Sequence, residues 1–192
     1  MNEMGYFDER KNVDDYIKMA EGYDGRDLIA ILQLHLQAGS TVLELGIGPG
    51  KDLDLLAQTY VVTGSDNSSL FLDLYREKHP EADLLQLDAV SLATKRKFDC
   101  IYSNKVLHHL PKSDIHRSFS RQKELLVANG LLLHSFWFGL KEESYHGLHF
   151  AYYSEEELLD TIGAGFDLVA IERYQEMEEG DSFYILLRKM EE

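Results

Sequence analysis

The chain has 192 residues and one cysteine, so it suits a single domain with a full hydrophobic core, excludes an internal disulfide and favours a reducing compartment. Its net charge of −15, from 34 acidic and 19 basic side chains, disfavours a nucleic-acid partner, because no basic cluster exceeds the run at 95–97. No apolar stretch is long enough to span a membrane and no secretory signal pattern is visible, so we expect a cytoplasmic protein without a membrane partner.

The first forty residues are expected to be helical, with a short helix near residues 13–20 and a second helix that stops before Gly39. We interpret residues 1–39 as an N-terminal helical cap on a single domain that spans residues 1–192. This segment is rich in aromatic residues, which either pack against the core or roof a pocket: Tyr6, Phe7, Tyr16 and Tyr23.

A glycine-rich stretch follows the first expected strand, where residues 42–52 read V-L-E-L-G-I-G-P-G-K-D. Three glycines at alternate positions, followed by helical apolar spacing from Leu53, predict a strand, a tight loop and a helix. The loop backbone can approach a ligand closely because glycine has no Cβ. The spacing E-x-G-x-G-x-G differs from the G-x-G-x-x-G of dinucleotide sites, and taken alone it is also compatible with a simple tight turn.

Further strands are expected at residues 60–65, 83–87, 98–103 and 131–138, alternating with helices. Residues 139–153 are expected to form a long aromatic loop. Ser154 and the three glutamates after it resemble a capping box, which predicts a helix to about residue 162.

The last two strands, at residues 166–174 and 182–189, are joined by a connection too short for a parallel crossover. They therefore predict an antiparallel hairpin. Five strands alternating with helices, then this hairpin, predict an α/β fold: a three-layer α-β-α sandwich with a mostly parallel sheet.

Ligands of such sheets bind beyond the carboxyl ends of the strands, near the point where the strand order reverses. The glycine-rich loop, Asp66, Asp88 and Asn104 each follow a different strand and are expected to meet there. Asp66 can accept hydrogen bonds from a ribose diol, and Asp88 can accept one from the exocyclic amine of a base. Because both are acidic and no P-loop lysine is present, the set favours a nucleoside with a positive or zwitterionic tail.

At these residues the chain resembles the class I S-adenosylmethionine-dependent methyltransferases. The resemblance covers the glycine-rich residues 42–50, Asp66 as the ribose-binding acid, residues 87–89 as the adenine motif and residues 98–110 as the fourth-strand motif. It extends to residues 130–133 and to the pattern at 153–166. It implies a seven-stranded sheet in the order 3-2-1-4-5-7-6, with one antiparallel strand, and S-adenosyl-L-methionine as the cofactor.

The residue pattern, together with this resemblance, predicts the following site residues. The expected cofactor-binding residues, with Tyr23 and Arg26 near the methionine carboxylate, are Tyr23, Arg26, Glu44, Gly46, Gly48, Pro49, Asp66, Asn67, Asp88, Ala89 and Asn104. The acceptor pocket is expected to be aromatic and to include Trp137, Phe138, Tyr145 and Tyr152. No catalytic residue is singled out, although His108 and His109 are candidate general bases.

Other reactive side chains are expected to be structural. His146 and His149 lack further ligands nearby, so no metal site is expected. Cys100 and His134 lie inside expected strands, and we interpret both as core residues.

The expected partner is a small-molecule methyl acceptor, with oxygen or nitrogen favoured over carbon as the methylated atom, and the protein is a monomer or a homodimer. The chain lacks the Pro-Pro-aromatic run and the Pro-Cys pair of nucleic-acid base methyltransferases. A module that binds S-adenosylmethionine or S-adenosylhomocysteine without catalysis is the alternative. A nicotinamide-dependent oxidoreductase is disfavoured by the position of the third glycine.

Overall fold

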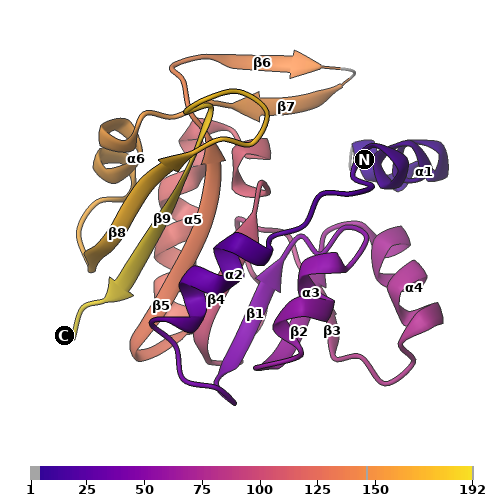
Figure 1. Ribbon diagram of the computed structural model, residues 1–192, viewed down its shortest axis with the longest axis horizontal. Coiled ribbons are helices and arrows are strands. Elements are labelled where there is room, and N and C mark those ends of the chain that lie inside the picture. Colours follow the sequence, from indigo (N-terminus) through magenta and orange to yellow (C-terminus); the bar gives the residue numbers. More distant parts are fainter. Residues whose placement is uncertain (1–4, 146, 192) are drawn as a thin grey trace.

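The computed structural model describes residues 5–145 and 147–191. Seven strands form one sheet in the order β3-β2-β1-β4-β5-β9-β8, and only β9 runs antiparallel to its neighbours (Figure 1). This arrangement confirms the predicted order, with β8 and β9 as the predicted hairpin. The strands of the sheet are β1 Thr41–Leu45, β2 Val61–Asp66, β3 Leu84–Gln86, β4 Phe98–Asn104, β5 Leu126–Trp137, β8 Phe166–Tyr174 and β9 Ser182–Lys189.

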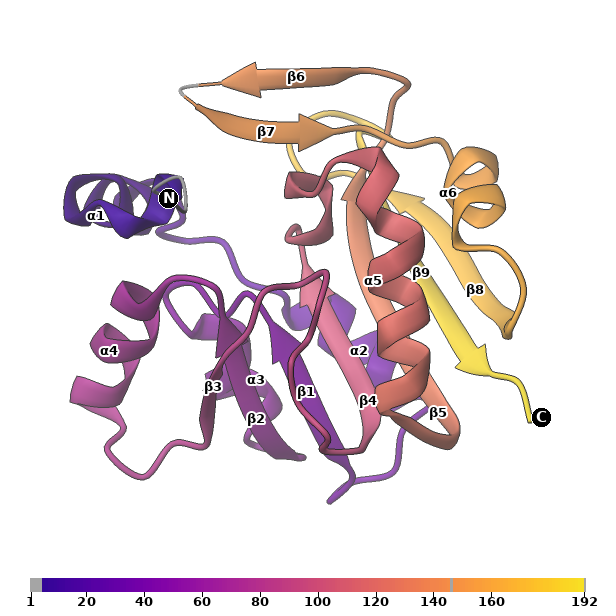
Figure 2. The same ribbon diagram turned by 180° about the vertical axis from the view of Figure 1, so that it is seen from behind.

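Helices cover both faces of this sheet, as expected for a three-layer sandwich. The α2 and α3 helices lie on one face, and α5 and α6 lie on the other (Figures 1 and 2). The helices are α1 Arg10–Met19, α2 Arg26–Gln33, α3 Lys51–Leu56, α4 Ser69–Lys78, α5 Lys112–Leu125 and α6 Glu155–Ile162, with short 3-10 turns at η1 Tyr6–Asp8 and η2 Leu107–His109. None of the helices in the described ranges is long and apolar enough to cross a membrane.

Strand β4 shows why the central strands are almost continuously apolar. Cys100 and Tyr102 pack toward α2, whereas Ile101 packs toward α5 through Phe119, and all four of these side chains are fully buried. A parallel strand that is covered on both faces has no polar side, so period-two alternation of apolar and polar residues is lost. Cys100 is therefore a core residue, as the sequence analysis expects.

The segment 139–153 is not the irregular loop expected from its sequence. It forms a separate two-stranded hairpin of β6 Glu142–Tyr145 and β7 Leu148–Ala151, with Gly147 in the turn at φ 85°. The Tyr152 hydroxyl donates to Glu143 Oε1 at 2.7 Å, next to the strand pair. Figure 1 shows this hairpin, with α1, beyond the end toward which the arrows of β1 and β4 point.

Three boundaries also differ from expectation. The first helix begins at Arg10, and α2 ends at Gln33, so Gly39 lies in a later turn at φ 83°. Strand β5 begins at Leu126 rather than at residue 131, because its register with β4 shifts near Asn129, whose φ is 59°. An irregularity of this kind lets the strand start early at an apolar residue.

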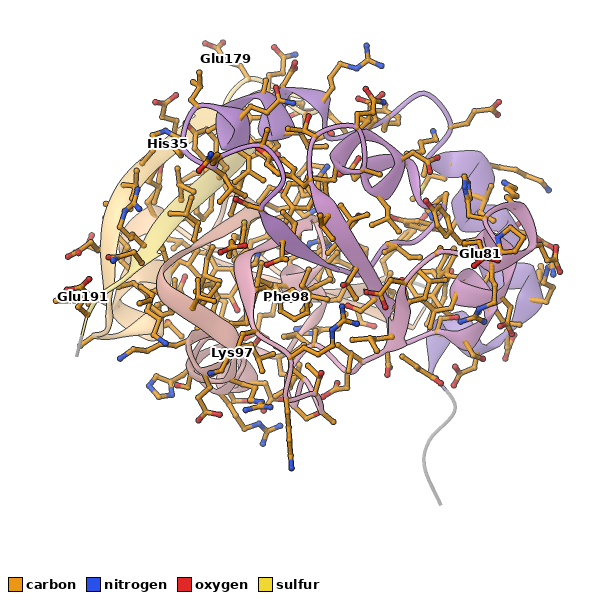
Figure 3. The ribbon with its side chains drawn as sticks, turned by 90° about the horizontal axis from the view of Figure 1, so that it is seen from below. His35, Glu81, Lys97, Phe98, Glu179 and Glu191 are labelled. Atoms are coloured by element: carbon orange, nitrogen blue, oxygen red, sulfur yellow. The ribbon has the colours of Figure 1, made fainter. Side chains whose placement is uncertain are left out.

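Figure 3 shows the sheet from the end at which the parallel strands begin. Phe98, at the start of β4, lies near the middle of this view, and Glu81 and Glu191 lie at the rim. The carboxyl ends of the parallel strands lie at the other end of the sheet and face the β6–β7 hairpin and α1 (Figure 1). The predicted ligand site is at these carboxyl ends.

The connection between β8 and β9 yields the first prediction. The Asp181 carboxylate accepts the backbone N–H groups of Glu176, Met177 and Glu178, each at 2.9 Å. Burial raises the pKa of Asp181, but these donors outweigh it, so the pKa lies below its ordinary 3.8. We expect Asp181→Ala to lower the free energy of unfolding by about 1–3 kcal/mol at neutral pH.

Urea denaturation measures this change, and Glu179→Ala in the same turn is the control, because the Glu179 side chain is exposed. A folded-state pKa below the unfolded value stabilises the fold above that value, so the difference between the wild type and Asp181→Ala should vanish in acid. Equal stability of the two variants at neutral pH would contradict the role of Asp181.

Candidate functional site

A cavity of about 260 Å³ opens at the carboxyl ends of β1, β2 and β3. Six of the residues expected to bind the cofactor line it: Gly46, Gly48, Asp66, Asn67, Asp88 and Ala89. The convergence of separate strand ends on one cavity follows from the reversal of strand order between β1 and β4, where helices leave toward opposite faces.

The glycines of the loop after β1 serve different purposes. A Cβ on Gly46 would lie 2.7 Å from the Val106 side chain, and one on Gly50 would lie 2.1 Å from the Tyr75 ring. Both residues also have positive φ, so packing and backbone conformation each require glycine there. A Cβ on Gly48 would meet only Tyr16, at 3.5 Å, so this position faces the cavity.

The N-terminal segment closes the cavity from above. Tyr6, Phe7 and Tyr16 line it, and the rings of Phe7 and Tyr16 both contact the ring of Phe71. Ser68 donates its hydroxyl to the Phe7 carbonyl at 2.7 Å. Three of the four N-terminal aromatic residues thus roof the cavity, whereas Tyr23 lies outside it and is exposed.

Asp66 lies at the end of β2 and is only 9% exposed. Its Oδ2 accepts the N–H of Gly48 at 3.0 Å, and its Oδ1 accepts the N–H of Ser68 at 2.9 Å. Burial raises the pKa of Asp66 to about 6, against the opposing effect of the backbone donors. The backbone N–H of Asn67 also stabilises the charged carboxyl, and the acceptor capacity that remains can receive a hydrogen bond from a ligand.

Two further carboxyl groups lie beneath the glycine loop. Glu44 is 3% exposed, and its Oε2 has no hydrogen-bond partner among the described residues. Burial, together with the charges of Asp52 and Asp66, holds the pKa of Glu44 well above its ordinary value. Asp52 accepts the N–H of Gly25 at 2.6 Å and the hydroxyl of Tyr102 at 2.7 Å. The raised pKa of Glu44 favours its neutral form, so the acidic character of the crevice comes from the aspartates that line it, Asp8, Asp66 and Asp88, and this lining suits a cationic ligand group.

Five expected cofactor residues do not line the cavity: Tyr23, Arg26, Glu44, Pro49 and Asn104. Arg26 is exposed and pairs with Asp24 at 2.7 Å. The Asn104 side chain donates to Asp52 at 3.2 Å and accepts from Ser135 at 2.6 Å. Asn104 therefore holds the Asp52 carboxylate in position outside the cavity lining. The lining residues Ser68, Phe71 and Leu148 carry no sequence signal that could have identified them.

A second cavity of about 230 Å³ adjoins the first. The residues common to both are Tyr6, Tyr16, Lys105, His109 and Leu148. Of the residues expected in the acceptor pocket, Trp137 and Tyr145 line this cavity. Phe138 and Tyr152 do not: the Arg173 guanidinium lies 3.5 Å from the Phe138 ring centre, and Tyr152 bonds to Glu143.

Both candidate histidines line the second cavity. His109 Nδ1 lies 2.7 Å from the His149 carbonyl and must donate to it, and burial lowers the pKa of His109 to about 4. His108 is 2% exposed, and its Nδ1 has no hydrogen-bond partner among the described residues. Burial holds the pKa of His108 well below its ordinary value, so both rings are neutral at neutral pH. His146 lies outside the described residues.

Lys105 follows β4 with φ 55° and lines both cavities. Its Nζ donates to the Phe136 carbonyl and the Ser182 hydroxyl, and it lies 3.8 Å from Glu176 Oε2. Burial lowers the pKa of Lys105 to about 8, although Glu176 favours its charged form. The nearby carboxylate thus balances its charge, and no sequence motif marks Lys105 as a site residue.

A buried chain of hydrogen bonds supports the loop that carries Ala89. The pKa of His134 is lowered to about 3 by burial, so its ring is neutral. Its Nε2 must donate to Gln122 Oε1 at 2.8 Å, which leaves Nδ1 to accept from Ser103 at 2.8 Å. Gln122 then donates to Ser118 at 3.1 Å, and Ser118 donates to the Ala89 carbonyl at 2.6 Å. His134 is thus a hydrogen-bonded core residue, as the sequence predicts.

Among the residues that the structure describes, no group of three or more His, Cys, Asp or Glu side chains is arranged to hold a metal ion.

Part of the chain is similar to known methyltransferases. A model described as a methyltransferase domain matches residues 42–130, just under half of the chain. The trans-aconitate 2-methyltransferase of an Azoarcus species is 33% identical over 101 residues, which cover 50% of this chain and 39% of that protein. The similarity thus spans about two fifths of that relative's length.

Solved structures share the fold over most of the chain. The 1,6-didemethyltoxoflavin-N1-methyltransferase of Burkholderia thailandensis, with bound 1,6-didemethyltoxoflavin and S-adenosylhomocysteine, has a TM-score of 0.78 at 21% identity and covers 93% of this chain and 83% of its own. The N-methyltransferase NodS of Bradyrhizobium japonicum, in complex with S-adenosylhomocysteine, has a TM-score of 0.71 at 17% identity, covering 90% and 91%. These likenesses show a common Rossmann-like methyltransferase fold.

The buried chain yields a second prediction. Gln122→Leu preserves much of the side-chain volume but leaves the His134 Nε2–H without an acceptor. We expect the free energy of unfolding to fall by about 1–3 kcal/mol, the usual effect of one unsatisfied buried polar group. Urea denaturation measures the change, and the exposed Gln37→Leu is the matched control. Equal destabilisation by both variants would show that the chain of hydrogen bonds contributes nothing.

Proposed function

We propose that the protein transfers a methyl group from S-adenosylmethionine to a small organic acceptor. It has the Rossmann-like fold of the S-adenosylmethionine-dependent methyltransferases, and its residues 42–130 match a methyltransferase domain. The observation that carries this proposal is the acidic crevice, in which Asp66 has free acceptor capacity and the neighbouring carboxyl groups have no cationic partner among the described residues. A sulfonium with an amino-acid tail complements that charge, whereas a pyrophosphate opposes it.

The proposed placement of the nucleoside uses the residues that line the first cavity. Asp66 accepts hydrogen bonds from the ribose hydroxyls. Asp88 accepts one from the adenine amine through Oδ2, because its Oδ1 already accepts the Ser91 N–H. Leu87 and Ala89 offer apolar contact to the base. The backbone at Gly46 and Gly48 lies along the remaining part of the cavity, above the acidic cluster.

When bound, the sulfonium supplies an activated methyl group and a neutral thioether leaving group. The protein's own contribution is then alignment, which can lower the barrier by ~7–11 kcal/mol. Tyr16, Lys105 and His109 line both cavities, so they flank the place where donor and acceptor meet. The aromatic roof excludes water from that place, and a ring such as Tyr16 stabilises a nearby cation.

The acceptor atom is proposed to be oxygen or nitrogen, and the protein is proposed to act in the cytoplasm as a monomer or homodimer. Residues 1–39 are proposed to act as a cap of a single domain, since the described part of this segment roofs the cavity. The Azoarcus relative takes its name from trans-aconitate, which is therefore one acceptor to test.

Calorimetric titration with S-adenosylmethionine, S-adenosylhomocysteine and NAD tests the proposal. We expect binding of the first two ligands only. We also expect Gly48→Val to weaken binding at least about tenfold, or 1.4 kcal/mol, because the side chain enters the cavity. Gly39→Val is the matched control: Gly39 also has positive φ, and a Cβ there would meet nothing within 4 Å.

Binding of NAD but not of the sulfonium would overturn the proposal. Release of S-adenosylhomocysteine in the presence of an acceptor library would separate a methyltransferase from the alternative, a module that binds S-adenosylmethionine without catalysis. Binding without turnover of any acceptor favours the alternative.

The pKa of Asp66 generates a pH prediction. Below about pH 6 the free carboxyl is protonated, and it must lose its proton to accept both ribose hydroxyls. Binding then releases a proton, so affinity for S-adenosylhomocysteine should fall by up to about tenfold per pH unit below pH 6 and level off above it. Calorimetry between pH 5 and pH 7.5 measures this dependence. Asp66→Asn cannot titrate, so a slope that persists in this variant would assign the effect to another group.

A further inference from the structure

The walls of the second cavity are mostly rings contributed by separate parts of the chain. Tyr6 and Tyr16 come from the N-terminal segment, His108 from η2, Trp137 from the end of β5 and Phe150 from β7. The rings of His108 and Phe150 stack at 5.4 Å and 28°, and Trp137 meets His108 edge-on at 6.5 Å and 80°. Such walls present rigid flat surfaces and complement a flat ring.

The charges around this cavity disfavour an anionic acceptor. Lys105 is the basic group at neutral pH among the described residues that line it, since both histidines are neutral. The donors of Lys105 already bond to Phe136 and Ser182, and Glu176 lies 3.8 Å away. Asp15, also in the lining, is acidic. A polycarboxylate would therefore lose its hydration without gaining an uncommitted cation from these residues.

One polar group of the cavity has no partner. The Nδ1 of His108 has no hydrogen-bond partner among the described residues and is shielded from solvent, although the ring itself lines the cavity. Buried polar atoms normally have hydrogen-bond partners, so an orphaned nitrogen in a cavity wall is the position at which a ligand group would compensate.

Resting on the proposed methyltransferase function, we infer that the acceptor is an uncharged aromatic or heteroaromatic ring that carries one O–H or N–H group. The ring lies between the aromatic walls of the second cavity, and its O–H or N–H donates to a ring nitrogen of His108. A saturated or polycarboxylate acceptor does not complement this cavity. His108 is thereby a specificity-determining residue for the acceptor.

Trp137 is the single tryptophan of the chain and lines the second cavity, so its fluorescence reports ligands that bind there once S-adenosylhomocysteine has saturated the first cavity. In the presence of saturating S-adenosylhomocysteine, the protein is titrated with phenol, toluene, cyclohexanol and trans-aconitate. We expect phenol to bind most tightly, with an affinity roughly fivefold higher than that of toluene, which lacks the donor. Cyclohexanol should also bind more weakly than phenol, because its ring is not flat. We expect no saturable change with trans-aconitate.

His108→Phe keeps a ring but removes the nitrogens, so the preference for phenol over toluene should disappear. His108→Gln retains a hydrogen-bonding group and should keep part of the preference. The control His79→Phe makes the same substitution at an exposed histidine outside both cavities, and it should bind both ligands as the wild type does. Calorimetry with S-adenosylhomocysteine on each variant reports whether it has folded with an intact first cavity.

Saturable binding of trans-aconitate with no binding of phenol would overturn the inference, and an equal preference in wild type and His108→Phe would overturn the role of His108. If S-adenosylhomocysteine binds in either case, the proposed methyltransferase function stands. If it fails to bind the wild type, the proposed function fails first, independently of the acceptor.

Discussion

The structure depends on carboxyl groups that are buried beneath and beside the glycine loop. Asp66 and Asp52 have no cationic partner among the described residues, and backbone N–H groups stabilise their charge instead. The N–H of Gly48 donates to Asp66 from a loop in which Gly46, Gly48 and Gly50 have positive φ, a conformation that glycine adopts without strain. The glycine loop and Asp66 therefore stabilise each other: the loop N–H donates to the carboxylate, and this hydrogen bond holds the loop in place.

Asp52 and two residues next to the acids, Lys51 and Ser68, anchor the N-terminal segment. Gly25 donates its N–H to Asp52, Lys51 donates to the Ala20 carbonyl, and Ser68 donates to the Phe7 carbonyl. A Cβ on Gly25 would lie 2.3 Å from an Asp52 oxygen, so the close approach requires glycine. The segment that roofs the cavity is thus attached at both of its ends to the residues that line the cavity or support it. Its folding is coupled to the integrity of the site.

The sequence predicts the parts of this site that local patterns encode. Apolar runs and turn residues identify the strands, the short link before Ser182 identifies the antiparallel hairpin, and the topology then brings Asp66 and Asp88 to one edge. Sequence patterns do not predict the side-chain contacts that distant segments make with one another. The β6–β7 hairpin reads as a loop because both strands are short and outside the main sheet, and Arg26 looks available for a carboxylate although Asp24 already binds it.

The two cavities differ in their electrostatics, and that difference bears on turnover. The first is bordered by buried carboxyl groups, whereas the described lining of the second is aromatic, with Lys105 balanced by Glu176. On the proposed function, a cationic sulfonium is favoured over the neutral thioether that remains after transfer, because only the former complements the acidic crevice. The charge that helps to bind the donor is therefore lost in the reaction itself. On this proposal the product makes one fewer favourable electrostatic contact with the crevice than the donor does, because it has lost the sulfonium charge.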